Sequence, residues 1–453
     1  MKRKLCFYLS LVICLLATTS FAERKLPNEF KWYENARYGL FYHWGLFTGG
    51  GSSTTGSKTL PFYKSVDEFE KAAGSPEKFA KNLVALTKDM GGAYLTLTLM
   101  HSCDKHMVIF PTKNPAFKYK TKNDYFGAVL NEAHKQGIKV IVYFPAHADH
   151  YKSDTENYII GLNHHPLSKE GTDFWYNTLN ALFKEMKERY GENSIDGFWM
   201  DGFISWQPVI NSFPKALRIG NNQVTFSLNP MPHFSTTEFL TSKCEPAYNR
   251  VSGLLKPNLE WGDDNLSPRK DFNEDIPTCN GWWYGGGKCN NEYVKDPTFL
   301  VKQILCSLGL KRKWNFTLGL GPLVDGTIPP EFKPMAKTVK EFFKWAKPAI
   351  YNTTGGIDAP LHGGWLNSGA FGVVTIDNKA PNTYYLSVLE PPTKFTKTML
   401  KIQHDWVKVK SITDLRTGKP LPFNVSGTIN ITSPDWTDIQ KYGAKVFKIV
   451  LEK

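Results

Sequence analysis

Ile195-Asp196-Gly197-Phe198-Trp199-Met200-Asp201-Gly202-Phe203 is the stretch on which the fold assignment depends. It is an apolar, aromatic run that ends on an acid followed by glycine, which is the pattern of a buried parallel strand. The last side chain of such a strand emerges at the carboxyl edge of the sheet. Asp201 is therefore the candidate reactive group, although an acid that only caps the next loop has the same local sequence.

Three earlier runs repeat the pattern of a buried strand that delivers polar groups at its end. Helical segments separate them, and the one before Ile195 has a clear 3.6-residue period, with Trp175, Leu179, Leu182 and Phe183 on one stripe. The strand runs are Tyr38 to Tyr42 before His43 and Trp44, Ala93 to Leu99 before His101, and Ile138 to Phe144, which contains Tyr143 and precedes His147 and His150.

The alternation of strands and helices continues to about residue 350 and predicts an α/β fold, a (β/α)8 TIM-type barrel over residues 23–350. Later strands are predicted at Val224 to Leu228, Leu259 to Trp261 and Asn315 to Leu320, and helices at Pro297 to Leu308 and Glu331 to Ala346. Residues 351–453 change to short β-branched runs between Pro, Gly and Asn turns. They predict a C-terminal antiparallel β-sandwich.

The first 22 residues have the features of a secretory signal peptide. A basic start at Met1-Lys2-Arg3-Lys4 precedes an apolar run, which exits through Ser20-Phe21-Ala22. The mature protein is therefore expected to be secreted or periplasmic, without a membrane span. The formal charge is +13, or +10 without the three basic residues of the leader, which suits an anionic glycan partner. No nucleic-acid-binding motif accompanies this charge.

Five cysteines remain after the leader, an odd number whose spacings match no metal-binding pattern. A disulfide from Cys279 to Cys289 is one option in an exported protein, but sequence does not fix the pairing. A carboxylate ringed by histidines suits either a metal site or a glycosidase pocket. The histidines come singly, with no second carboxylate at ligand spacing, and the adjacent tryptophans offer the apolar face on which a sugar stacks. We therefore expect no metal and no cofactor.

Four motifs resemble the α-L-fucosidases of glycoside hydrolase family 29. This resemblance covers the chain from Trp32 to about Tyr351 and implies a barrel followed by a β-sandwich, with metal-independent hydrolysis that retains configuration. The motifs are Trp32-Tyr-Glu-Asn-Ala-Arg-Tyr-Gly-Leu-Phe-Tyr-His-Trp-Gly45, Tyr94 to His101, Asp196 to Gly202, and Leu318-Gly-Leu-Gly-Pro-Leu-Val-Asp-Gly-Thr-Ile-Pro329.

The resemblance implies that Asp201 is the nucleophile, and it implies a substrate-binding pocket of His43, Trp44, His101, Tyr143 and Trp283. Retaining hydrolysis needs a second carboxyl about 5–5.5 Å away as acid/base. The family carries this group on a variable loop before an aromatic motif like Trp282-Trp283-Tyr284. Glu274 fits that position best, with Asp275 and Glu260 as alternatives.

One departure from the family affects the sugar-reading region. Where the family has Lys-His-His-Asp-Gly, this chain has Met100-His101-Ser102-Cys103-Asp104, so the second histidine is missing unless His106 replaces it. The expected activity is exo-hydrolysis of terminal α-L-fucosyl residues of oligosaccharides or polysaccharides. The alternatives are α-L-galactoside hydrolysis by the same mechanism on sulfated algal chains, and a disabled barrel that only binds carbohydrate. The sequence does not indicate an oligomeric state.

Overall fold

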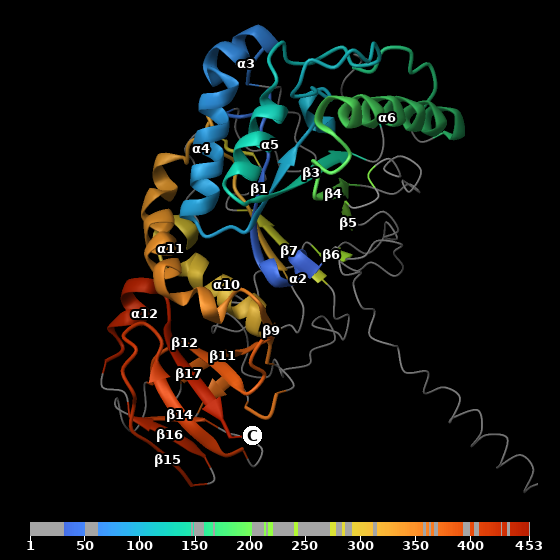
Figure 1. Ribbon diagram of the computed structural model, residues 1–453. Helices are drawn as coiled ribbons and strands as arrows, with labels where there is room; N and C mark the ends of the chain where they lie inside the picture. The colour runs from blue at the N-terminus through green and yellow to red at the C-terminus, as the bar shows by residue number, and fades with distance from the viewer. Residues whose placement is uncertain are drawn as a thin grey trace, which may run out of the picture.

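The computed structural model shows a parallel β-barrel with its helices, followed by an antiparallel β-sandwich (Figure 1). All statements below concern the part of the chain that the structure describes. It comprises residues 31–49, 62–145, 148, 158–165, 168–201, 213, 216–220, 240–242, 272–277, 283–285, 292–310, 315–356, 359–361, 364–366, 370–392, 399–402, 407–426, 428–432 and 435–452.

The barrel sheet has eight strands in the order β5-β4-β3-β2-β1-β8-β7-β6, and its paired neighbours run parallel. The two end strands, β5 and β6, also lie in contact. The chain is thus a (β/α)8 barrel followed by a β-sandwich. The barrel strands are β1 (Tyr38–Tyr42), β2 (Tyr94–Thr98), β3 (Lys139–Pro145), β4 (Gly197–Asp201), β5 (Leu217–Gly220), β6 (Leu240–Ser242), β7 (Phe272–Pro277) and β8 (Asn315–Gly319).

Side-chain alternation divides each barrel strand between two cores. In β1, Tyr38, Leu40 and Tyr42 belong to the large core between the sheet and its helices, whereas Phe41 belongs to a smaller core inside the barrel. Strand β4 follows the same rule, with Phe198 in the outer core and Trp199 inside. Odd-numbered positions of β1 and β4 therefore face the barrel interior. The same alternation decides which residues at the ends of these strands face the interior.

An aromatic floor closes the amino-terminal end of the barrel. The short helix α2 (Lys31–Ala36) places Tyr33 5.3 Å from Tyr94, measured between ring centroids, and both rings are fully buried. The Tyr94 hydroxyl is 2.6 Å from the hydroxyl of Thr317 across the barrel. Asn315 donates to the Tyr33 carbonyl at 2.7 Å, which ties α2 to β8. The barrel interior below the strand ends is therefore packed.

The helices around the barrel carry the end signals that their sequences predict. Ser75 caps α4 by accepting from Lys78 N, and Ser168 caps α6 by accepting from Gly171 N. Gly191, with φ of 89°, ends α6 just before β4. The helices are α3 (Val66–Ala73), α4 (Pro76–Asp89), α5 (Tyr125–Lys135), α6 (Lys169–Tyr190), α9 (Glu292–Lys295), α10 (Phe299–Leu310) and α11 (Lys333–Ala346).

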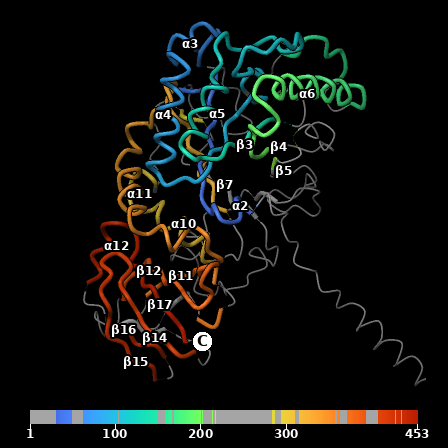
Figure 2. The backbone as a smooth tube through the Cα atoms, in the orientation of Figure 1, coloured from blue at the N-terminus to red at the C-terminus, as the bar shows by residue number. Residues whose placement is uncertain are grey.

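The C-terminal part contains a six-stranded and a three-stranded antiparallel sheet, drawn in orange and red in Figure 2. Helix α12 (Thr437–Tyr442) precedes the last strand. The strands are β9 (Thr353–Gly355), β10 (Gly364–Leu366), β11 (Ala370–Asp377), β12 (Thr383–Glu390), β13 (Met399–Ile402), β14 (Val409–Asp414), β15 (Phe423–Val425), β16 (Ile429–Thr432) and β17 (Lys445–Leu451).

The sandwich packs beneath α10 and α11 (Figure 1). Gly309 of α10 lies so close to β11 that an added Cβ would sit 2.5 Å from the Val373 Cβ. Trp345 of α11 meets Tyr442 of α12 edge to face, with ring centroids 5.7 Å apart. Val373, Tyr385 and other sandwich residues belong to the same apolar cluster as the barrel's outer core. The barrel-facing side of the sandwich therefore joins the barrel's outer core, whereas the interior of the sandwich forms a separate apolar cluster.

Several predicted features lie outside the described residues: the signal peptide, the strands at residues 224–228 and 259–261, and the disulfide between Cys279 and Cys289. Strand β7 is a correction, because residues 272–277 were expected to form a loop. Among the helices that the structure describes, none has the length and apolar character needed to cross a membrane.

Candidate active site

Four of the predicted pocket residues meet at the carboxyl end of the barrel. His43 follows β1, His101 follows β2, and Tyr143 lies near the end of β3. The ring of His43 lies 5.4 Å from that of His101 and 5.6 Å from that of Trp283, and the Trp283 ring is 5.7 Å from His101. His101 stacks on Tyr143 at 5.3 Å with an interplanar angle of 12°. We call His43, His101, Tyr143 and Trp283 the ring cluster.

Asp201 is joined to the ring cluster through a hydrogen bond. The Tyr143 hydroxyl donates to Asp201 Oδ2 at 2.8 Å. Tyr143 is 1% exposed, and in the β3–β4 register it pairs with Trp199, two residues before Asp201. Asp201 is only partly buried. The hydrogen bond fixes the orientation of its carboxylate.

Trp283 is held over the two histidines through its backbone neighbours. Gly49 N donates to the Tyr284 carbonyl at 2.8 Å, which ties residues 283–285 to the segment after β1. A Cβ on Gly321 would lie 2.1 Å from Tyr284 N, so the segment after β8 approaches this backbone as only glycine allows. Segments after β1 and β8 thus position the Trp283 ring.

A buried carboxyl connects the ends of β1 and β2. Asp104 is 1% exposed and accepts from Phe47 N at 3.1 Å, three residues after Trp44. Burial raises the pKa of the Asp104 carboxyl well above its ordinary value, and backbone N–H groups of Phe47 and Leu46 oppose that rise. The contact holds the segment after His43 against the segment after His101.

Trp44 does not belong to the pocket, contrary to the prediction. It is 1% exposed, stacks on Phe79 at 3.9 Å between ring centroids, and its indole N–H donates to the Val324 carbonyl at 2.9 Å. The physical reason is alternation: His43 continues the inward face of β1, so the next residue turns toward the helices. His106 does not join the ring cluster either. It is buried, and its ring meets the Trp175 ring of α6 edge to face, with ring centroids 5.4 Å apart.

Two aromatic residues that the sequence analysis missed lie directly below the ring cluster. Phe41 is 4.5 Å from His43 and 5.4 Å from Trp199, and Trp199 is 5.4 Å from Tyr143. Both are nearly fully buried. The sequence contained a signal for both residues. Phe41 precedes His43 by two residues and Trp199 precedes Asp201 by two, and residues two apart in a strand lie on the same face of the sheet.

Glu274 and Asp275 both lie in strand β7, not on the expected loop. In the β7–β8 register, position 274 pairs with Phe316 and position 275 with Thr317. Phe316 belongs to the outer core, while Thr317 bonds across the barrel interior to Tyr94. Register partners in a parallel sheet share a face, so position 275 falls on the interior face and position 274 on the outer one. Glu260 lies outside the described residues.

The assembled geometry suits recognition of a polar ligand with an apolar face. Two imidazoles and a phenol supply donors and acceptors, the Trp283 ring supplies a stacking surface, and Asp201 supplies a carboxylate at one side. Among the described residues, no three His, Cys, Asp or Glu side chains are grouped so that they could hold a metal ion.

Comparison with known proteins gives one family and a consistent set of structures. A family model described as alpha-L-fucosidase matches residues 16–347. A search of curated protein sequences finds no significant match.

Solved structures resemble the whole chain at low sequence identity. An alpha-L-fucosidase GH29 from Bacteroides thetaiotaomicron, trapped as a covalent intermediate, is 17% identical, covers 95% of this chain and 97% of its own, and has a TM-score of 0.67. Alpha-L-fucosidase isoenzyme 1 from Paenibacillus thiaminolyticus is 17% identical over 94% and 99%, with a TM-score of 0.67. The Thermotoga maritima alpha-fucosidase in complex with fucose is 17% identical over 93% and 96%, with a TM-score of 0.64. These likenesses establish the fold.

Proposed function

Because the chain belongs to the alpha-L-fucosidase family of glycoside hydrolases, we propose that it is a secreted or periplasmic exo-glycosidase that releases terminal α-L-fucosyl residues with retention of configuration. The observation that carries this proposal is the hydrogen bond that joins Tyr143 of the ring cluster to Asp201. The basic and apolar start of the chain supports export.

Asp201 acts as the nucleophile in this mechanism. Its carboxylate attacks the anomeric carbon while the glycosidic C–O bond breaks, and a second carboxyl gives its proton to the leaving oxygen. The same carboxyl then takes a proton from water, which displaces Asp201 and restores the free enzyme. His43 and His101 bind sugar hydroxyls, and Trp283 packs against the apolar face of the ring.

For the acid/base role, the pairing register supports Asp275 ahead of Glu274, because position 275 falls on the interior face of the sheet. Glu260 remains the third candidate. Loss of the true acid/base slows substrates with poor leaving groups far more than activated ones, and azide restores turnover by attacking the glycosyl intermediate. We expect D275N to show both the stronger dependence on the leaving group and the rescue by azide. E274Q and E260Q should show neither effect.

The deciding experiment compares wild type with Asp201→Ala on aryl α-L-fucoside. We expect the variant to lose at least about a thousandfold in kcat/KM, since the chemical step has no nucleophile. Asp173→Asn on the surface of α6 is the matched control, because it removes a half-exposed carboxylate that forms an ion pair with Lys169 of the same helix. Proton NMR of the first-formed sugar should show the α-anomer. Equal activity of the Asp201 variant would refute the proposal.

Aryl α-L-galactoside, assayed in parallel, tests the second candidate substrate. The observation that favours it is the altered second strand end, where His106 packs against Trp175 while Ser102 and Cys103 follow His101. Loss of the second histidine from the pocket wall would leave space for the additional C6 hydroxyl of L-galactose. Preference for the galactoside would keep the roles of Asp201 and the ring cluster and change only the sugar.

A further inference from the structure

A second group of basic and aromatic side chains lies beside the ring cluster and takes no part in the proposed chemistry. The Lys105 ammonium lies 5.1 Å from the centroid of the Tyr119 ring and 5.5 Å from that of Tyr158. The Lys118 ammonium lies 5.5 Å from the same Tyr119 ring. The two tyrosines meet edge to face at 6.0 Å. We call Lys105, Lys118, Tyr119 and Tyr158 the basic platform.

Backbone hydrogen bonds build the basic platform from three separate segments. Val108 N donates to the Tyr119 carbonyl at 3.1 Å, which pairs the Lys105 segment with the Tyr119 segment. Ile160 N donates to the Ala116 carbonyl at 2.8 Å, which attaches the segment of Tyr158. Lys105 itself has a φ of 54°, a conformation that costs a non-glycine residue about 1–2 kcal/mol. The surrounding contacts thus hold the platform in one arrangement.

The basic platform is connected to the pocket through the backbone that follows β2. The carbonyl of His101 accepts from Asp104 N and from His106 N, both at 3.0 Å, so Lys105 lies within one turn of a ring-cluster residue. It follows β2 at the carboxyl end of the barrel, where Asp201 also lies. Lys105 is partly exposed and Lys118 exposed. A group attached to a sugar bound in the ring cluster would leave the pocket at this end of the barrel.

The Lys105 and Lys118 ammonium groups both lie against the Tyr119 ring. Charge-assisted hydrogen bonds from lysine to sulfate or carboxylate oxygens are stronger than neutral ones, and the exposed part of the Tyr119 ring offers a face for a sugar. The positive balance of the whole chain, +13, adds attraction at longer range.

We propose that the basic platform is a binding site for an anionic sugar, bearing a sulfate ester or a carboxylate, in the part of the substrate next to the cleaved residue. This inference deepens the proposed function and rests on it. It makes the preferred substrate a fucosylated acidic glycan and assigns Lys105 and Lys118 as specificity-determining residues.

The test uses the double variant Lys105→Gln/Lys118→Gln and four substrates: aryl α-L-fucoside, a neutral fucosyl oligosaccharide, and its sulfated and uronic-acid counterparts. For the acidic substrates we expect KM to rise about tenfold, equivalent to about 1.4 kcal/mol, with kcat unchanged. The aryl and neutral substrates should change less than about twofold, because a rim charge does not act on the bond that breaks. Raising the salt concentration to about 0.5 M should abolish the wild-type preference for acidic substrates.

Lys135→Gln is the matched control. Lys135 is exposed at the carboxyl end of α5, just before β3 begins, and so lies at the opposite end of the barrel. The substitution removes one positive charge, half the change made by the double variant, without touching the platform, and we expect wild-type kinetics on all four substrates. An equal effect of Lys135→Gln would show that overall charge, not the platform, attracts the glycan.

A calorimetric titration separates failure of this inference from failure of the proposed function. Wild-type protein is titrated with acidic oligosaccharides that lack the terminal fucose and so require no turnover. Binding that the double variant loses supports the site, and binding of only the sulfated or only the uronic-acid sugar identifies the anion. Equal binding by wild type and double variant would overturn the inference. Absence of turnover on aryl α-L-fucoside would instead count against the proposed function.

Discussion

The Tyr143 hydroxyl gives the first test at the scale of single residues. Tyr143→Phe removes the donor that lies 2.8 Å from Asp201 Oδ2 and leaves the stacked ring in place. A hydrogen bond to a charged group contributes about 1.5–3 kcal/mol, so we expect kcat/KM to fall about 10–100-fold. The acid limb of the pH–rate profile should move to higher pH, because the lost bond favours the ionised carboxylate.

Tyr176→Phe is the control for this variant. The Tyr176 hydroxyl is buried on α6 and has no hydrogen-bond partner among the described residues. Its loss should leave both kcat/KM and the pH profile unchanged. A Tyr143→Phe variant with the wild-type pH profile would show that the hydroxyl does not act on Asp201.

Gly321 is the second residue with a predictable effect. A Cβ at this position would lie 2.1 Å from Tyr284 N, so Gly321→Ala must push residues 283–284 and the Trp283 ring away from His43 and His101. We expect KM for aryl α-L-fucoside to rise about tenfold, because a displaced stacking ring loses roughly 1–1.5 kcal/mol.

Gly137→Ala serves as the control for the glycine substitution. Its φ of 73° makes alanine strained there, yet nothing lies within 4 Å of the added Cβ, and the site is far from the pocket in the loop before β3. It should lower stability without changing KM. A Gly321→Ala variant with unchanged KM would exclude Trp283 from substrate binding.

Asp196, at the amino-terminal end of β4, gives a pH-dependent stability. It accepts from His134 Nε2 at 2.9 Å, from Lys139 Nζ at 2.7 Å and from Val140 N at 2.9 Å. Burial alone would raise the pKa of its carboxyl, but these bonds together lower it below its ordinary value. The stability that ionised Asp196 contributes to the fold is therefore fully present above the unfolded-state pKa of about 3.9. This stability is lost as the pH falls through the lower pKa of the folded state.

We expect Asp196→Asn to reduce the free energy of unfolding by about 1–3 kcal/mol at pH 7, with the difference from wild type shrinking below about pH 4. Urea unfolding followed by circular dichroism at several pH values measures it. Asp173→Asn, which removes a half-exposed surface carboxylate, should show no such pH dependence. A constant difference at all pH values would assign the effect to packing.

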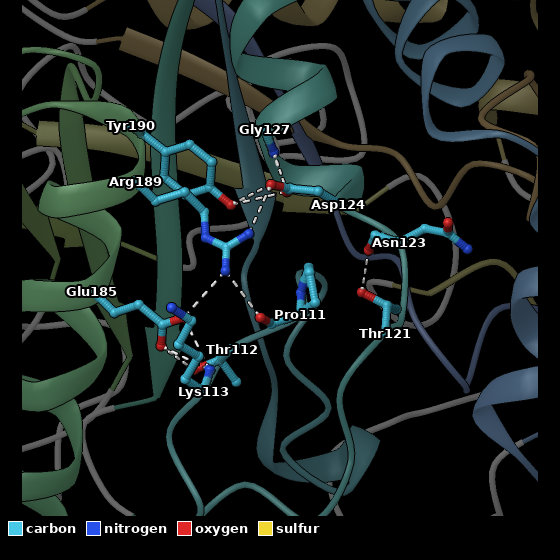
Figure 3. A network of polar contacts seen from close by, with 10 residues as sticks. All are labelled: Pro111, Thr112, Lys113, Thr121, Asn123, Asp124, Gly127, Glu185, Arg189 and Tyr190. Atoms are coloured by element: carbon cyan, nitrogen blue, oxygen red, sulfur yellow. Dashed lines mark hydrogen bonds and ion pairs between the residues drawn. The ribbon is translucent and has the colours of Figure 1, made fainter.

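At the scale of elements, α6 anchors the long connection between β2 and α5 (Figure 3). Glu185 accepts from the Thr112 hydroxyl at 2.5 Å and from Lys113 N at 2.9 Å. Arg189 donates to the Pro111 carbonyl at 3.0 Å, and the Tyr190 hydroxyl donates to Asp124 at 2.9 Å. This connection carries His101 near one end and three of the four platform residues, Lys105, Lys118 and Tyr119.

Glu185→Ala should loosen this connection without touching the pocket. Losing the acceptor leaves the Thr112 hydroxyl and Lys113 N without their bonds, so we expect amide exchange at residues 112–114 to accelerate by about tenfold or more. Glu188→Ala on the exposed face of α6 is the control and should leave these amides protected. Hydrogen exchange read by mass spectrometry distinguishes the two variants, and unchanged exchange would mean that the bonds of Arg189 and Tyr190 hold the connection without Glu185.

The sequence predicted the elements whose hydrophobic pattern is strong. Strands β1 to β4 are apolar runs, and their positions were confirmed within two residues. The 3.6-residue stripe from Trp175 lies within α6, whose end before Gly191 was also confirmed. The strand at Phe272–Pro277 was missed because Asn, Glu and Asp interrupt its apolar pattern and only its pairing with β6 and β8 defines it. The prediction for Trp44 was wrong because it relied on nearness to His43 in the sequence. Consecutive residues of a strand face opposite sides, so Trp44 points into the outer core.

At the scale of the whole molecule, Gly309 tests whether the β-sandwich braces the barrel. Gly309→Val would place side-chain atoms where Val373 of β11 already lies, 2.5 Å from the Cβ position. We expect a loss of about 1–3 kcal/mol in the free energy of unfolding from overpacking. Thermal unfolding that separates into two transitions would show that the shared core couples the parts, and an unchanged single transition would contradict it. Gly418→Val, at an open turn, is the control for backbone strain.

The aromatic floor under the barrel has a consequence for the route that a glycan takes. Among the described residues, Tyr33, Tyr94 and Thr317 pack together at the amino-terminal end of the barrel, so a sugar reaches the ring cluster from the carboxyl end. A polymer cannot be threaded past this packed end, and the released sugar has to leave by the carboxyl end, where the chain end entered. Each cleavage therefore ends with complete dissociation of the sugar before the next chain end can dock, which makes trimming a sequence of separate encounters.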